Sequence, residues 1–181
     1  MKNILTTLKL IDTFTLELDI NKNDFIKNFK QHIKSSEFSF PSNTLDFSSN
    51  KTKYKGYIKQ SEFKISKPLR AFKQKNFAVA DGIFIQKDNK LFIETKIFIP
   101  NEQLFNFYFF IVMFIIGLII FIFNHDDDGV RFLFGFGSII GSVVFFFGIL
   151  MAQDGVRSLK YELNKEFKNI ELMQKENNKL N

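Results

Sequence analysis

The sequence contains no cysteine and only two histidines, His32 and His125. The absence of cysteine excludes disulfide bonds, cysteine-ligated zinc and thiol catalysis. One histidine lies in a helical pattern and the other beside three aspartates, so no Ser-His-Asp set can be assembled from them. We therefore predict a non-enzymatic protein that needs no cofactor.

Charge is absent from two long stretches, residues 105–123 and 132–151. A helix rises about 1.5 Å per residue, so about 20 residues cross the hydrocarbon core of a bilayer, which is about 30 Å thick. Helices of a soluble core normally carry a polar stripe toward water, and neither stretch has one. We therefore predict a transmembrane hairpin of two helices, residues 103–123 and 131–151, joined by a short acidic loop, residues 124–130. The lack of ionisable residues in both spans argues against a pump.

A cleavable signal peptide is not expected at the start of the chain. The apolar residues 4–11 form too short a stretch, contain Lys9 and are followed by no small-residue cleavage site. The first span follows a polar segment, residues 1–100, which we expect to form a domain before membrane insertion begins.

Basic residues are distributed unevenly around the two spans. Residues 1–104 hold 18 Lys and Arg against 11 Asp and Glu, and residues 152–181 hold 6 against 5. Between the two uncharged stretches, residues 124–131 offer only Arg131. Lys and Arg in short flanking segments stay on the cytoplasmic side. We therefore predict a multi-pass protein of the cytoplasmic (inner) membrane, with both termini in the cytoplasm and the acidic loop outside.

The N-terminal segment shows the patterns of an α+β domain. Apolar and polar residues alternate over residues 13–20, which is typical of a half-buried strand. Asn21 or Asn23 can cap a helix over residues 21–34. Further strands are expected at residues 37–40, 53–60, 62–66, 77–86 and 91–99, the last two forming a hairpin turned by Asp88-Asn89. The predicted fold is α+β, a small antiparallel sheet with one N-terminal helix. This order also occurs in lipid-binding helix-grip domains, but it is too little to assign that fold.

Two apolar surfaces leave alternatives open. In the predicted hairpin, Phe84, Phe92 and Phe98 are expected opposite the other apolar residues, so another subunit, lipid or the tail helix would approach that face. The tail, residues 156–179, has the spacing of an amphipathic helix. It can pack on the sheet, pair with a second copy or lie on the bilayer. The apolar positions of the tail are Leu159, Leu163, Phe167, Ile170 and Met173.

Small residues gather in the second span. Gly137 and Gly141 form a GxxxG pattern, and the first span contains Gly117. Small residues let helices approach closely in lipid. We favour packing of the hairpin on itself over a homodimer, because the short loop forces the two helices together. The run from His125 to Asp128 lacks the spacing of a calcium-binding loop, so we interpret it as a solvated turn and predict no metal site.

A basic stretch, residues 51–75, contains nine Lys and Arg and only one acidic residue. Near a cytoplasmic leaflet each such charge gains about 1 kcal/mol from anionic lipid, and nucleic acid would also attract it. Because the domain is expected to be tethered to a bilayer, we predict lipid headgroups as partners and no nucleic acid. A plain solvated strand face explains the pattern equally well. The residues predicted to contact headgroups are Lys53, Lys55, Lys59 and Lys64.

The segment from Tyr54 to Pro100, with KGYI, FKIS, DGIFI and NKLFIETKIFIP running into the first span, carries a resemblance. It resembles small, uncharacterised bacterial membrane proteins that have a cytoplasmic α+β domain followed by a two-span hairpin. The resemblance implies no activity and no site residues. The sequence thus predicts a membrane-anchored interaction or lipid-sensing module that self-associates. The alternative is an accessory subunit of a membrane transporter or export complex.

Overall fold

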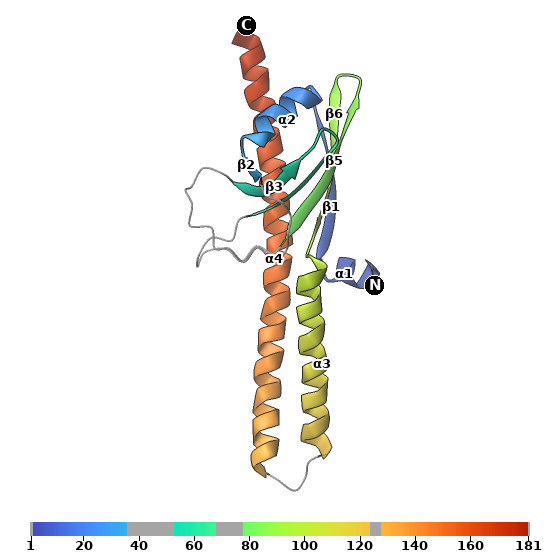
Figure 1. The fold of residues 1–181 in the computed structure, drawn as a ribbon, viewed down its shortest axis with the longest axis vertical. Coiled ribbons are helices and arrows are strands. Elements are labelled where there is room, and N and C mark those ends of the chain that lie inside the picture. The colour runs from blue at the N-terminus through green and yellow to red at the C-terminus, as the bar shows by residue number, and fades with distance from the viewer. Residues whose placement is uncertain (1, 36–52, 68–77, 124–127, 181) are drawn as a thin grey trace. The chain divides into compact units, whose positions relative to one another are not determined.

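The computed structural model describes residues 2–35, 53–67, 78–123 and 128–180. The chain forms two compact units (Figure 1). The first unit comprises Met1–Ile99 together with Gln153–Asn181, and the second comprises Pro100–Ala152. The two chain segments of the first unit are therefore separated in sequence by the whole of the second.

The first unit is built on a six-stranded sheet with the order β1-β6-β5-β4-β3-β2. All neighbouring strands are antiparallel except β2 and β3, which run parallel. The predicted all-antiparallel sheet is therefore wrong at this edge. A parallel pair needs a crossover longer than a hairpin loop, and residues 36–53 provide the necessary length of chain. The strands are β1 (Ile11–Leu18), β2 (Ile33–Ser35), β3 (Tyr54–Ile58), β4 (Glu62–Ser66), β5 (Val79–Lys87) and β6 (Lys90–Phe98).

Two short helices accompany the sheet, α1 (Lys2–Thr7) and α2 (Lys22–Lys30), where the sequence predicted only the second. Asn21 caps α2, because its side chain accepts a hydrogen bond from the backbone N–H of Asn23 at 2.9 Å. The helix ends earlier than predicted because the following residues pair with β3 as β2. The strand predicted at residues 37–40 lies outside the described residues.

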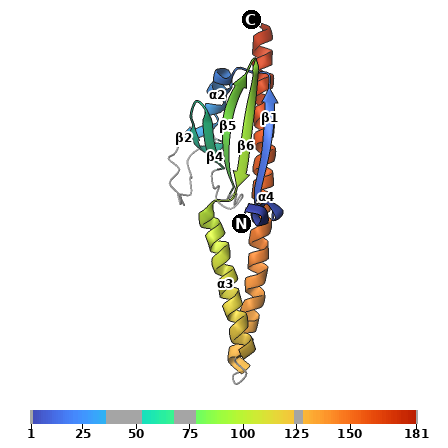
Figure 2. The same cartoon turned by 90° about the vertical axis from the view of Figure 1, so that its right-hand side faces the viewer.

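The core of the first unit lies between the sheet, α2 and the later part of α4 (Asp128–Leu180). Phe167 of α4 packs edge-on against Phe25 and Phe29 of α2, with ring centroids 5.4 Å and 5.0 Å apart. Phe63 of β4 joins the same cluster. The tail helix thus packs on the sheet, and α4 runs alongside it in both views (Figure 2). This outcome decides between the three alternatives left open by the sequence.

The two faces of the β5–β6 hairpin differ from the predicted assignment. Phe84 is 3% exposed and contacts Phe25 and Phe63 in the core. The register pairs Ile85 with Phe92, and the alternation of side chains places both on the opposite face from Phe84. The prediction that Phe84 shares a face with Phe92 and Phe98 was therefore wrong. Apolar residues lie on both faces of β5, so the alternation along the strand did not show which face is buried.

The second unit contains α3 (Asn101–Phe123) and the first part of α4. The sequence predicted separate helices at residues 131–151 and 156–179, whereas α4 continues through the residues between them. Gly155 is the only helix-breaking residue there, and one glycine costs a helix only about 1 kcal/mol. Within the described residues, the predicted tail helix is therefore the continuation of the second apolar helix.

Candidate functional site

The helices of the second unit present their apolar side chains outward. Phe109 of α3 is 55% exposed, and Phe146 of α4 is 68% exposed. Of the described residues, one helix, from Gly135 onward, is long and apolar enough to cross a membrane by length and composition. Only 6% of its apolar window is buried. The described apolar part of α3, Tyr108–Phe123, is shorter. The described residues thus contain one candidate span and an outward-facing apolar surface.

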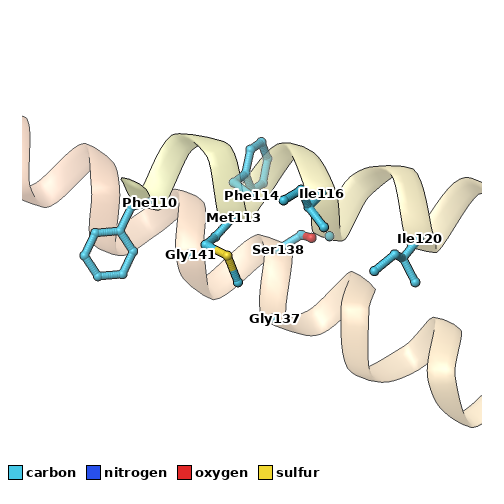
Figure 3. A pocket seen from close by; sticks show the side chains of 9 residues that line it. Phe110, Met113, Phe114, Ile116, Ile120, Gly137, Ser138 and Gly141 are labelled. Carbon is cyan, nitrogen blue, oxygen red and sulfur yellow. The ribbon is translucent and has the colours of Figure 1, made fainter. Parts of the chain in front are cut away.

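An apolar groove of about 560 Å³ lies between α3 and α4 in this unit (Figure 3). Its wall has a single hydroxyl side chain, that of Ser138. The nearby Ser142 donates its hydroxyl to the backbone carbonyl of Ser138 at 2.8 Å, so it is satisfied within its own helix. The other lining residues are Phe110, Met113, Phe114, Ile116, Gly117, Ile120, Gly137 and Gly141.

The structure brings the three predicted packing glycines together along this groove. A Cβ atom at Gly137 or Gly141 would meet nothing within 4 Å, whereas one at Gly135 would lie 3.0 Å from the ring of Phe121. Close approach inside the hairpin is therefore found at Gly135, which the sequence analysis did not select. The role of Gly117, Gly137 and Gly141 in helix packing stays a prediction.

The lysines predicted to bind headgroups do not form one patch. The ammonium group of Lys53 lies 2.7 Å from Glu166 on α4, and that of Lys59 lies 2.7 Å from Glu62. Lys64 lies opposite Asp81 in the register of β4 and β5, on the face away from α4, because the preceding Phe63 packs on Phe167. Lys55 shares that face by register. Their contact with lipid stays a prediction, and four of the nine basic positions lie outside the described residues: Lys51, Arg70, Lys73 and Lys75.

A polar cluster borders the core where α4 meets β2 and β3. Glu166 is buried and is approached by Lys53 on one side and by the ring nitrogen Nδ1 of His32 at 3.3 Å on the other. Burial, reinforced by the negative charges of Glu166 and Glu162, raises the pKa of Tyr54 well above its usual range. Lys67 is bound to Glu162 and to the hydroxyl of Ser158 at 3.2 Å. These contacts fix α4 on the sheet.

Metal binding finds no support in the part of the chain that the structure describes, because no group of three or more His, Asp or Glu side chains converges there. Of the predicted solvated turn from His125 to Asp128, residues 125–127 lie outside the described residues, and Asp128 is the first residue of α4.

A second pocket, of about 380 Å³, lies at one edge of the first unit, and charged residues contribute to its lining. The connection from α1 to β1 forms one wall, and the residues of α4 that follow Ala152 form the other. Lys9 and Arg157 line it, and both are exposed. Sequence reasoning used these two residues only for the signal-peptide and orientation arguments. Because the two residues are well over a hundred positions apart, no local pattern in the sequence indicated that they line the same pocket. The other lining residues are Thr6, Ile11, Asp12, Gln153 and Val156.

Comparison with protein-family models, curated proteins and solved structures finds no match for this chain.

Proposed function

We propose that this chain is a two-span integral membrane protein whose hairpin holds a cytoplasmic α+β domain at the bilayer. In this proposal it is a non-enzymatic interaction or lipid-sensing module of the cytoplasmic membrane. The proposal assigns the anchor to the second unit and the interaction surface to the first.

The outward-facing apolar surface of the second unit carries the proposal. Ile119 is 50% exposed on α3 and Val144 is 55% exposed on α4, and both helices repeat such positions along their length. Soluble proteins rarely expose contiguous apolar patches of more than a few hundred Å². A helix of a soluble core would bury these side chains, whereas lipid accepts them without cost.

The length of α3 supports a second span. Its 23 residues correspond to about 35 Å of helix, and a hydrocarbon core is about 30 Å thick. Its only charged residue is Glu102, in the first turn, where it can reach the interface. The excess of Lys and Arg on both flanks of the hairpin supports cytoplasmic termini.

Alkaline extraction of membranes tests the anchor. We expect the full chain to stay with the membrane pellet, because apolar spans are not released by high pH. A variant with Ile119→Lys and Val144→Lys places one charge in each span, at about 2.5–3.5 kcal/mol apiece for insertion, and it should lose membrane retention. Release of the unaltered chain into the supernatant, folded without detergent, would overturn the proposal.

Purification from native membranes tests the module. Recovery of the chain alone or as a homo-oligomer fits the proposal. A stoichiometric complex with a transport protein would instead favour an accessory subunit.

A further inference from the structure

We propose that the pocket lined by Lys9 and Arg157 binds the phosphate group of an anionic phospholipid headgroup. This inference rests on the proposed function, because it needs the hairpin to be in a bilayer. It assigns the lipid contact to residues other than the lysines of the basic stretch.

The pocket borders both places where the chain passes between the two units. Ile99, the last residue before the first passage, donates its backbone N–H to the carbonyl of Leu10 at 3.2 Å. Gln153, the first residue after the second passage, donates its side-chain amide to the carbonyl of Leu8 at 2.9 Å. In a chain anchored by its hairpin, residues beside both passages are those that connectivity keeps close to the membrane interface.

The spacing along α4 agrees with the depth of a headgroup. Arg157 follows Met151, the last residue of the uncharged stretch, by six positions, or about 9 Å of helix. The headgroup region of a bilayer is about 5–8 Å deep on each side. The long side chain of Arg can bridge the remaining distance, because its apolar stem lies along the protein while its charged end reaches a polar layer.

The charges of the pocket suit a phosphate. The side chains of Lys9 and Arg157 make no hydrogen bond or ion pair within the described part of the chain. The one acidic residue of the lining, Asp12, is bound by the ammonium group of Lys160 at 2.9 Å and 3.0 Å through its two oxygens. Two cations therefore remain uncompensated. Arg binds phosphate through two parallel N–H donors, and Lys supplies a point charge.

The backbone presents Lys9 in an unusual conformation. Its φ of 52° lies in the left-handed region, which residues other than glycine seldom adopt. Two hydrogen bonds hold it there, from the N–H of Lys9 to the carbonyl of Thr6 at 3.0 Å and from the N–H of Leu10 to the carbonyl of Leu5 at 2.9 Å. The turn thus ends α1 and fixes the position from which the Lys9 side chain enters the pocket.

The basic stretch offers a weaker site by the same criteria. The ammonium groups of Lys53 and Lys59 are already bound to the carboxylates of Glu166 and Glu62. A lipid phosphate would have to displace those carboxylates. In the pocket no such displacement is needed.

The test uses the full chain in mild detergent and follows its thermal unfolding while phosphatidylglycerol or phosphatidylcholine is added. We expect phosphatidylglycerol to raise the unfolding temperature and phosphatidylcholine to leave it unchanged. The double variant Lys9→Gln, Arg157→Gln should bind phosphatidylglycerol on the order of tenfold more weakly or worse, since each charge near anionic lipid contributes a several-fold effect. The conservative pair Lys9→Arg, Arg157→Lys should keep most of the binding.

The matched control is Lys165→Gln, Lys168→Gln, which removes the same charge from exposed positions of α4 away from the pocket. An equal loss of binding in the control and in the pocket variant would overturn the proposal, because only net charge would then matter. Water-soluble glycerol phosphate is the second arm: an effect equal to that of phosphatidylglycerol would assign the pocket to free phosphate esters and refute the lipid.

The inference and the proposed function fail in different ways. A chain that is released from membranes by alkaline extraction contradicts the anchor. A chain that stays in the membrane but responds equally to both lipids contradicts the headgroup site alone.

Discussion

Gly82 of β5 lies under the ring of Phe63, and no side chain fits between them. A Cβ atom there would lie 2.4 Å from two atoms of the ring and 3.0 Å from the carbonyl oxygen of Glu94. The ring cannot move freely, because it also packs against Phe29 and Phe167. The aromatic core therefore depends on the absence of a side chain at this position.

Gly82→Ala should destabilise the protein by about 1–3 kcal/mol, the usual cost of overpacking a core. The measurement is urea unfolding of the full chain in mild detergent, followed by near-UV circular dichroism. Gly137→Ala is the matched control, because its Cβ would meet nothing within 4 Å. Equal stability of Gly82→Ala and the wild type would show that the core is looser than described.

Tyr54 predicts a change in stability at high pH. Its pKa in the folded protein is raised by burial and by the nearby carboxylates of Glu166 and Glu162. In the unfolded chain tyrosine ionises near pH 10. A raised folded pKa means that the unfolded state loses its proton first, so stability is present below about pH 10 and falls as pH rises above it.

Tyr54→Phe should therefore show a smaller fall in unfolding temperature than the wild type between about pH 9 and 11, the range around the unfolded pKa. Tyr161→Phe, at a residue that is 69% exposed, is the control and should behave as the wild type does. If both variants follow the wild-type curve, ionisation of Tyr54 does not limit stability at high pH.

At the scale of elements, the later part of α4 completes the core of the first unit. Phe167 is fully buried, as are Leu163, one turn before it, and Leu159, two turns before it. Phe167→Ala should cost about 3–5 kcal/mol, the range for removing a buried aromatic ring. We expect faster amide hydrogen exchange over residues 156–176 and over α2. The control Leu172→Ala changes a residue that is 59% exposed and should leave exchange unchanged.

The two helices of the second unit allow a paired test of the glycines. Gly135→Leu should lower the stability of the hairpin, since even a Cβ would lie 3.0 Å from the ring of Phe121. Gly141→Leu should be tolerated, because its side chain would enter the open groove. Thermal stability in detergent measures both, and oligomer size is recorded with it. A larger loss of stability for Gly141→Leu than for Gly135→Leu would contradict this account of the packing.

Local patterns predicted several elements well. The strand predicted at residues 62–66 is β4 (Glu62–Ser66) with its observed bounds, and of the two caps that the sequence offered, Asn21 or Asn23, it is Asn21 that begins α2. The apolar spacing of the tail predicted its buried face at Leu159, Leu163 and Phe167. These features are decided by neighbours within one or two turns or along one strand, so they are present in short stretches of sequence.

Features that depend on distant residues could not be predicted in this way. The parallel pairing of β2 with β3 joins segments separated by a long connection, and it converted the predicted end of a helix into a strand. α4 continues through Gly155, since one glycine costs a helix only about 1 kcal/mol. The change from an apolar to a polar sequence at this point made one helix look like two. The meeting of Lys9 and Arg157 depends on α4 returning to the sheet after the second unit.

At the scale of the whole molecule, the return of the chain to its first unit has a consequence for topology. Residues before Pro100 and residues after Ala152 belong to the same compact unit, because α4 supplies part of its core. Both segments must therefore lie on the same side of any membrane that the second unit crosses. A single span would place them on opposite sides and would separate Phe167 from Phe25. An even number of crossings is consequently required for the fold of the first unit to persist.

Single cysteines can test this requirement directly, because the natural chain has none. We place one at Gln60, one at Asn124 and one at Asn178 in separate variants, and treat intact cells with a membrane-impermeant thiol reagent. The excess of basic residues beside the hairpin predicts that only position 124 reacts, while positions 60 and 178 react after the cells are permeabilised. Labelling of 60 and 178 but not 124 would reverse the orientation and keep two crossings. Labelling of only one of 60 and 178 would mean an odd number of crossings, and the core formed by α2, the sheet and α4 could not then exist in the membrane-inserted protein.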